Sequence, residues 1–273
     1  MADEISAGQI VKDLTAELEK KPEVLVFVLF GSQARETIYT ATEDSDIDTH
    51  VIVQDNQREE FEKELPEIVR KLGPVIFSYH NQWAGFSTVF ANLQRLEIPV
   101  KKFSEMATAF DRPKQQPVKV LIDRTNGELQ FLLDKRPEKI DFGPKFAEKI
   151  SDFWYMAIVA AQYFKKGEIY NARRALMILS TALVRLTEYL VDPDILLLEA
   201  YKQVEKFIPS ERQKILKDSS PAYGEREVKA ALILTINDFS AVSHELAQKS
   251  GYNFPNLATG EIVKKKLLTL LGE

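Results

Sequence analysis

The chain has 273 residues, of which 45% are apolar, and a formal net charge of −5 at pH 7. That length suits one large domain or two modest ones, and the apolar content is enough for a buried core. The negative charge argues against a protein built mainly to hold nucleic acid, which usually presents a basic face. The absence of cysteine excludes disulfides and thiolate metal sites.

The start of the chain and its hydropathy predict a soluble cytoplasmic protein. The stretch MADEISAGQIVKDL is acidic and amphipathic, and it lacks the basic and apolar regions of a signal peptide. No apolar run approaches the ~18 residues of a membrane-spanning helix. We therefore expect neither a membrane partner nor a nucleic-acid partner.

The first half of the chain alternates helical and strand patterns. Apolar residues recur at helical spacing in 5–20 and 56–73, and Pro66 predicts a kink or a boundary in the second segment. Strand patterns occur at 24–30, 46–53, 74–80, 86–93, 95–103 and 117–123. This mixture predicts an α+β domain built on a mixed sheet.

The second half reads as helical from about Lys145 to the end. Long amphipathic segments fill it, at 146–167, 169–190 and 225–251. Proline, glycine and charged residues gather in 132–146, which favours a domain boundary there. We expect a first domain over residues 1–140 and an all-helical bundle over residues 141–273.

The stretch FGSQARETIYTATEDSDID, residues 30–48, joins two of the predicted strands. Gly31 follows a buried strand and can let the backbone approach a phosphate closely. Ser32 offers a hydroxyl, and the residues after it would begin a helix whose free N–H groups favour an anion. The first part of the stretch is therefore typical of a phosphate cradle.

The end of the stretch carries two aspartates, Asp46 and Asp48, separated by Ile47. On a strand both carboxylates point to the same face, where like charges repel each other. Mg²⁺ resolves this conflict, since it prefers oxygen ligands and is commonly held by one or two carboxylates plus substrate phosphates. The plain alternative is two solvated acids at the start of a strand. With Gly31 and Ser32 upstream, we predict a site for a metal-bound triphosphate.

The order Gly-Ser, spacer and Asp-x-Asp resembles the motif of the polymerase β-like nucleotidyltransferases. The spacer, residues 33–45, is toward the long end of the pattern, and Thr49 stands where the family usually has an apolar residue. A mixed α/β domain followed by helices is similar to the small-molecule branch, which adenylylates aminoglycoside and lincosamide antibiotics.

This resemblance implies transfer of a nucleoside monophosphate from ATP, or another nucleoside triphosphate, to a hydroxyl of a small molecule. It implies two Mg²⁺ ions held by Asp46 and Asp48, with Gly31 and Ser32 on the β- and γ-phosphates. Arg35, one helical turn after Ser32, would either add positive charge at the triphosphate or lie on the surface.

The family normally adds a third carboxylate from a later strand, and Glu97 is the best candidate here. It stands alone among apolar residues, where a charge is costly without a partner. Pro99 predicts an edge strand or a bulge at this point. Asp111 and Asp123 are rivals, although Asp123 has an ordinary role in a DRTNG turn. Glu97 would be a metal ligand, a general base, or both.

Other functions remain open beside this one. A catalytically silent nucleotide-binding or regulatory, antitoxin-like protein would share the fold, but it would be free to lose an acid that this chain keeps. A helical ribonuclease partner is disfavoured. Such domains carry an arginine and a histidine close together on one helix, and the predicted helices of this chain do not. A polynucleotide-extending enzyme lacks its basic track. The long apolar helices could pair two subunits as a homodimer or close on themselves.

Overall fold

The computed structural model describes residues 5–31, 34, 45–81, 85–111, 114, 116–138, 143–193, 201, 204–220, 223–252, 254 and 256–273. The chain divides into two compact units, Met1–Ile140 and Asp141–Glu273. Among the described residues, no helix is long and apolar enough to cross a membrane.

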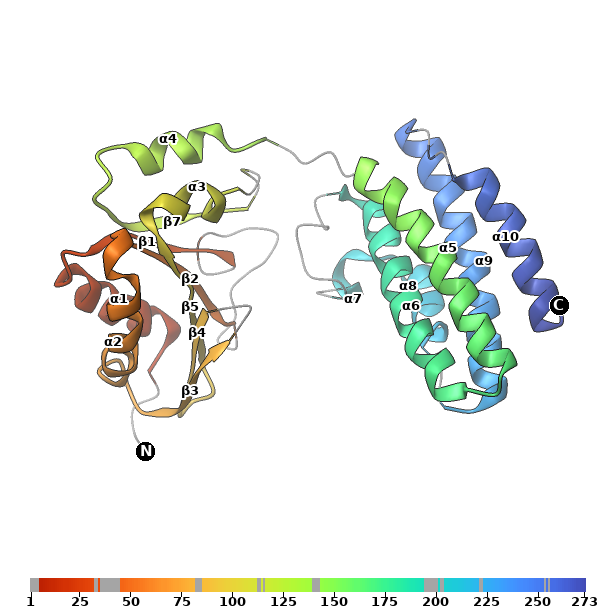
Figure 1. Cartoon of the computed structure of the whole chain (residues 1–273), viewed down its shortest axis with the longest axis horizontal. Helices are drawn as coiled ribbons and strands as arrows, with labels where there is room; N and C mark the ends of the chain where they lie inside the picture. The colour runs from red at the N-terminus through yellow and green to blue at the C-terminus, as the bar shows by residue number, and fades with distance from the viewer. Residues whose placement is uncertain are drawn as a thin grey trace. The chain divides into compact units, whose positions relative to one another are not determined.

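The first unit is built on a seven-stranded sheet (Figure 1). Its elements in chain order are α1 (Ala7–Glu19), β1 (Val24–Leu29), β2 (Ile47–Val53), η2 (Asp55–Gln57), α2 (Arg58–Arg70), β3 (Val75–Asn81), β4 (Gly85–Phe90), β5 (Arg95–Ile98), β6 (Val100–Lys102), η3 (Phe103–Glu105), α3 (Met106–Ala109), β7 (Lys119–Asp123) and α4 (Glu128–Lys135). The strand order is β3-β4-β5-β2-β1-β7, and β6 also pairs with β2.

The sheet is mixed, as the sequence predicts. β2 pairs in parallel with β5 and with β6, whereas β1 is antiparallel to β2 and β7, and β4 is antiparallel to β3 and β5. The parallel pairing follows from the helix that connects β2 to the later strands, since parallel neighbours need a crossover connection. The α+β class is confirmed.

Side chains of the sheet alternate between two apolar cores. On one face α1 and α2 pack against the strands, burying Leu14 and Leu65 together with Val51. On the other face Met106 of α3 and Leu129 of α4 form a smaller core with Val26, Val28, Phe30 and Ile52. The two pairs of helices lie on different sides of the sheet (Figure 1).

Two prolines behave differently from the sequence expectation. Pro66 lies inside α2, which runs unbroken from Arg58 to Arg70, so the boundary proposed there is wrong. Pro99 separates β5 from β6, and β5 pairs on both sides, with β4 and with β2. The expected edge strand is therefore wrong. The proline is tolerated because it falls in the break between two strands, where its carbonyl still accepts a hydrogen bond from the Val51 amide, at 3.0 Å.

Every element described in the second unit is helical (Figure 1). The helices are α5 (Gly143–Lys165), α6 (Ile169–Val191), α7 (Val204–Phe207), α8 (Ser210–Asp218), α9 (Glu225–Ser250) and α10 (Leu257–Leu271). Phe153, Trp154 and Phe239 lie in its apolar core. Gly260 of α10 admits the Trp154 indole, since a Cβ at this position would collide with the ring. The predicted helical region is confirmed.

Candidate active site

Strand register brings two of the predicted acids side by side. In the parallel pair of β2 and β5, Asp48 is directly opposite Glu97 and Ile47 is opposite Leu96. Ile47 and Leu96 are fully buried in the core under α1 and α2. Because side chains alternate along a strand, Asp48 and Glu97 lie together on the opposite face. Residues 49 positions apart in sequence thus become neighbours.

Gly31 closes one side of this arrangement. It has a φ of +63°, a left-handed conformation that favours glycine, and a Cβ at this position would lie 2.8 Å from the Asp48 Oδ2 atom. The neighbouring Phe30 amide donates a hydrogen bond to the Asp48 carbonyl, at 2.9 Å. The end of β1 is therefore held directly against the Asp48 carboxylate, where the backbone of Gly31 can approach a phosphate closely.

Asp46 lies one residue before β2, and its carboxylate forms an ion pair with Arg95. The distance between Arg95 Nη2 and Asp46 Oδ2 is 3.0 Å. Arg95 is two residues before Glu97 on β5, so it shares the face of the acids. Within the described part of the chain, no three acidic or histidine side chains form a group that could hold a metal ion. As the structure stands, Asp46 is turned to Arg95 rather than gathered with Asp48 and Glu97.

Two polar side chains that sequence reasoning missed fix the geometry of the acids. The Gln94 amide, in a side chain that is almost fully buried, donates to the Ser45 carbonyl and so holds the approach to Asp46. The hydroxyl of Thr49, which is 2% exposed, donates to the Glu97 carbonyl at 2.6 Å. Thr49, which departs from the family pattern, therefore links β2 to β5 at Glu97 through its hydroxyl. Neither role could be found from sequence, because both depend on which strands pair.

The other predicted positions are less favoured by the structure or lie outside it. The Asp123 carboxylate accepts hydrogen bonds from the Thr125 amide, at 2.8 Å, and the Thr125 hydroxyl, at 2.6 Å, so it forms a turn. Asp123 ends β7, which is next to β1 and not to β2. Asp111 follows α3 and belongs to no strand. Ser32 and Arg35 lie outside the described residues.

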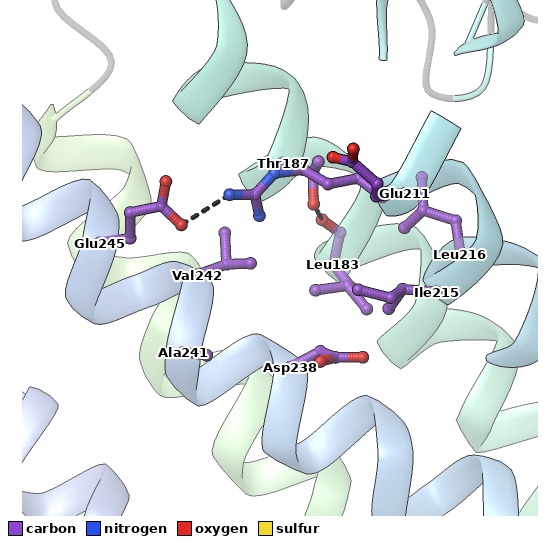
Figure 2. A pocket seen from close by; sticks show the side chains of 10 residues that line it. Leu183, Thr187, Glu211, Ile215, Leu216, Asp238, Ala241, Val242 and Glu245 are labelled. Carbon is purple, nitrogen blue, oxygen red and sulfur yellow. Dashed lines mark hydrogen bonds and ion pairs between the residues drawn. The ribbon is translucent and has the colours of Figure 1, made fainter. Parts of the chain in front are cut away.

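The helical unit contains the acids Glu188 and Asp238, whose pKa values are raised by burial. Glu188 is fully buried, its Oε2 atom accepts a hydrogen bond from Arg185 Nη1 at 2.7 Å, and burial raises its pKa although Arg185 opposes the change. A cavity of about 300 Å³ is lined by Asp238, Glu211 and Glu245, with Arg212 paired to Glu245 at 2.6 Å (Figure 2). Burial also raises the pKa of Asp238.

A mixed sheet followed by a helical region is the fold class that the resemblance to the nucleotidyltransferases predicts. The family model described as streptomycin adenylyltransferase matches residues 9–265, and the chain belongs to this family. It is an adenylyltransferase-type enzyme, as the resemblance implied.

Two solved structures have chains that align with this one over nearly its whole length. An aminoglycoside 6-adenyltransferase from Bacillus subtilis is 14% identical, with 97% of each chain covered and a TM-score of 0.45. A spectinomycin adenyltransferase from Enterococcus faecialis, solved with ATP and spectinomycin, is 13% identical, with 97% of this chain and 99% of that one covered and a TM-score of 0.36. Because both scores are low, the assignment rests on the family model. A comparison with curated proteins gave no match.

Proposed function

We propose that this protein transfers AMP from ATP to a hydroxyl of an aminoglycoside, with lincosamides as the second acceptor class to test. The placement of Asp48 directly opposite Glu97, with Gly31 against the Asp48 carboxylate, is the observation that carries the proposal. Membership of the streptomycin adenylyltransferase family supports both the nucleotide and the class of acceptor. The net charge of −5 would also favour the approach of a cationic acceptor.

The chemistry of the donor set fits Mg²⁺, because Asp48 and Glu97 supply carboxylate oxygens from two neighbouring strands and Asp46 supplies another from the residue before β2. We propose that Asp46 and Asp48 hold two ions, with Glu97 as an additional ligand. When bound, the ions would neutralise the triphosphate and the charge that develops during transfer. Asp46 must then exchange its partner Arg95 for metal, which an exposed ion pair permits at small cost.

In the proposed reaction, the acceptor oxygen forms a bond to the α-phosphorus of ATP. The bond from that phosphorus to the oxygen bridging it to the β-phosphorus breaks, and pyrophosphate leaves. Glu97 accepts the proton of the acceptor hydroxyl, as a general base next to the Asp48 carboxylate. The Gly31 backbone, with Ser32 and Arg35, is assigned to the β- and γ-phosphates, where a glycine lets the main chain come close.

The experiment measures pyrophosphate release from each of the four ribonucleoside triphosphates with Mg²⁺. The acceptors are streptomycin, spectinomycin and a lincosamide, and Asp46→Ala is the control. We expect pyrophosphate release only when both ATP and an aminoglycoside are present, and we expect none from Asp46→Ala. If triphosphate binds but no acceptor of the panel causes pyrophosphate release, the transfer reaction is refuted. If triphosphate does not bind in a metal-dependent way, the site itself is refuted.

A further inference from the structure

The row of residues that contains the acids continues across the sheet onto β4 and β3. Glu97 is opposite Ser87 of β4, and Ser87 is opposite Tyr79 of β3. Directly paired residues share a face of the sheet, so Tyr79, Ser87, Glu97 and Asp48 form one row. Neighbouring strands are ~4.8 Å apart, which puts the Tyr79 backbone about 10 Å from that of Glu97. A sugar or cyclitol ring with its hydroxyl and amino substituents fits between side chains on strands this far apart.

Two aromatic rings end this row at the edge strand. Phe77 and Tyr79 are two residues apart on β3, their ring centroids are 6.0 Å apart, and they are 51% and 49% exposed. Phe77 is opposite Val89, which is opposite Arg95, so both rings lie on the face of the acids. We call Phe77 and Tyr79 the aromatic shelf. Two exposed aromatic rings on the face of the acids are suited to contact with a ligand there.

Ser87 lies between the aromatic shelf and Glu97 and is an unusual serine. It is only 6% exposed, yet its Oγ atom has no hydrogen-bond partner among the residues that the structure describes. A buried hydroxyl without a partner costs free energy, and such groups in native structures call for an explanation. The Oγ atom is covered in this structure, so a hydroxyl or amino group of a ligand would supply the missing bond by displacing the side chains over it. Ser87 is therefore a candidate polar contact beside Glu97.

We propose that the aromatic shelf and Ser87 bind the acceptor, as an amino-bearing sugar or cyclitol ring; this inference rests on the proposed function. The order β3-β4-β5-β2-β1 separates the two substrates. The phosphate side ends at Gly31 after β1, so a hydroxyl that gives its proton to Glu97 approaches from β4. The ring carbons stack on Phe77 and Tyr79, and a protonated amino group is attracted to their faces.

The test measures binding of streptomycin, spectinomycin and a lincosamide by calorimetry to the full-length wild type and to Phe77→Ala and Tyr79→Ala. Phe131→Ala is the matched control, since Phe131 of α4 is 57% exposed in the same unit. We expect affinity for the bound acceptor to fall about tenfold in each shelf variant, the size of one lost ring contact to a cation. Affinity for ATP stays unchanged, and Phe131→Ala behaves as wild type.

Ser87→Ala provides a second readout that a structural role would not produce. We expect kcat/KM for the acceptor to fall about fivefold, as for one lost hydrogen bond, while the thermal midpoint is equal to or above that of wild type. A serine that only supports the fold would instead lower the midpoint and leave kcat/KM for the acceptor intact.

Four results would overturn the inference. The first is unchanged acceptor affinity in both shelf variants, and the second is a fall in ATP affinity instead, which would assign the rings to the nucleobase. The third is a change in sedimentation mass in Tyr79→Ala, which would make the face a protein interface. The fourth is a wild type that binds no acceptor of the panel. Binding needs no turnover, so failure of the proposed function would appear separately, as acceptor binding without transfer of AMP.

Discussion

The two units of this protein place their carboxylates in opposite ways. In the sheet unit, Asp48 and Glu97 are partly buried on one face and come from strands far apart in sequence. In the helical unit, Glu188 is enclosed and paired with Arg185 one turn away on the same helix, and burial raises its pKa. Main-chain pairing of β2 with β5 places Asp48 beside Glu97, so either side chain can be replaced without breaking that strand pairing. Glu188, in contrast, is part of the core that encloses it.

The largest effect should come from Asp48. We expect Asp48→Ala to lower AMP transfer by at least about 10³-fold, since a metal ligand supplies several kcal/mol of charge stabilisation. The thermal midpoint should stay close to that of wild type, because the main-chain pairing of β2 and β5 remains. Steady-state assays and thermal melts on the same preparation check both parts. Wild-type turnover in this variant would end the assignment of the site.

Glu97→Gln should have the next largest effect. The amide keeps the size of the side chain but cannot accept the acceptor's proton, so turnover should fall at least ~100-fold, the lower end of a general-base contribution. Normal activity would show that Glu97 is not the third carboxylate and would transfer that assignment to Asp111 or Asp123, although neither lies near β2.

Gly31→Ala tests the close approach of the β1 end to Asp48. The new Cβ would be strained at a φ of +63° and would displace the Asp48 carboxylate, so kcat/KM should fall about 10- to 100-fold. Gly251→Ala is the matched control, because its φ is +67° and, apart from its chain neighbours, no described residue has an atom within 4 Å of the added Cβ. Both variants should melt earlier. Equal activity losses would show that strain, and not contact with Asp48, is responsible.

Arg95→Met should have a small effect, in the direction of tighter metal binding. Removing the guanidinium frees Asp46, so the Mg²⁺ concentration for half-maximal rate should fall about two- to fivefold, the size of an exposed ion pair. Arg70→Met, which breaks an exposed ion pair with Glu67 on α2, is the control. A higher Mg²⁺ requirement in Arg95→Met would instead assign Arg95 to the triphosphate.

Glu188→Gln should leave transfer unchanged and alter only stability. For an acid whose folded pKa is raised, the folded state binds more protons, so stability falls as pH rises from the unfolded value near 4.5 to the raised folded value. Relative to the glutamine variant, wild type should therefore lose stability with rising pH across this window. Thermal melts of both proteins from pH 4 to pH 8 measure it. A constant difference across that range would contradict the raised pKa.

The sequence was sufficient for features that depend on local patterns. Hydrophobic periodicity separates the sheet unit from the helical unit, and the alternation of Asp46, Ile47 and Asp48 is visible in three residues. Features that depend on strand pairing were not visible. The interior position of β5, the bond from Thr49 to the Glu97 carbonyl and the ion pair of Arg95 with Asp46 join residues about 50 apart. The aromatic shelf escaped for the same reason, because only register shows that Phe77 and Tyr79 share a face with Glu97.

The most direct test of the account follows which phosphorus of ATP reaches the acceptor. Wild type and Asp48→Ala are each incubated with Mg²⁺, an aminoglycoside and ATP labelled either at the α- or at the γ-phosphorus. We predict that wild type transfers only the α-label to the acceptor and that Asp48→Ala transfers neither. Label from the γ-position on the acceptor would make the reaction a phosphoryl transfer. Persistent α-label transfer in Asp48→Ala would place the chemistry away from this face of the sheet.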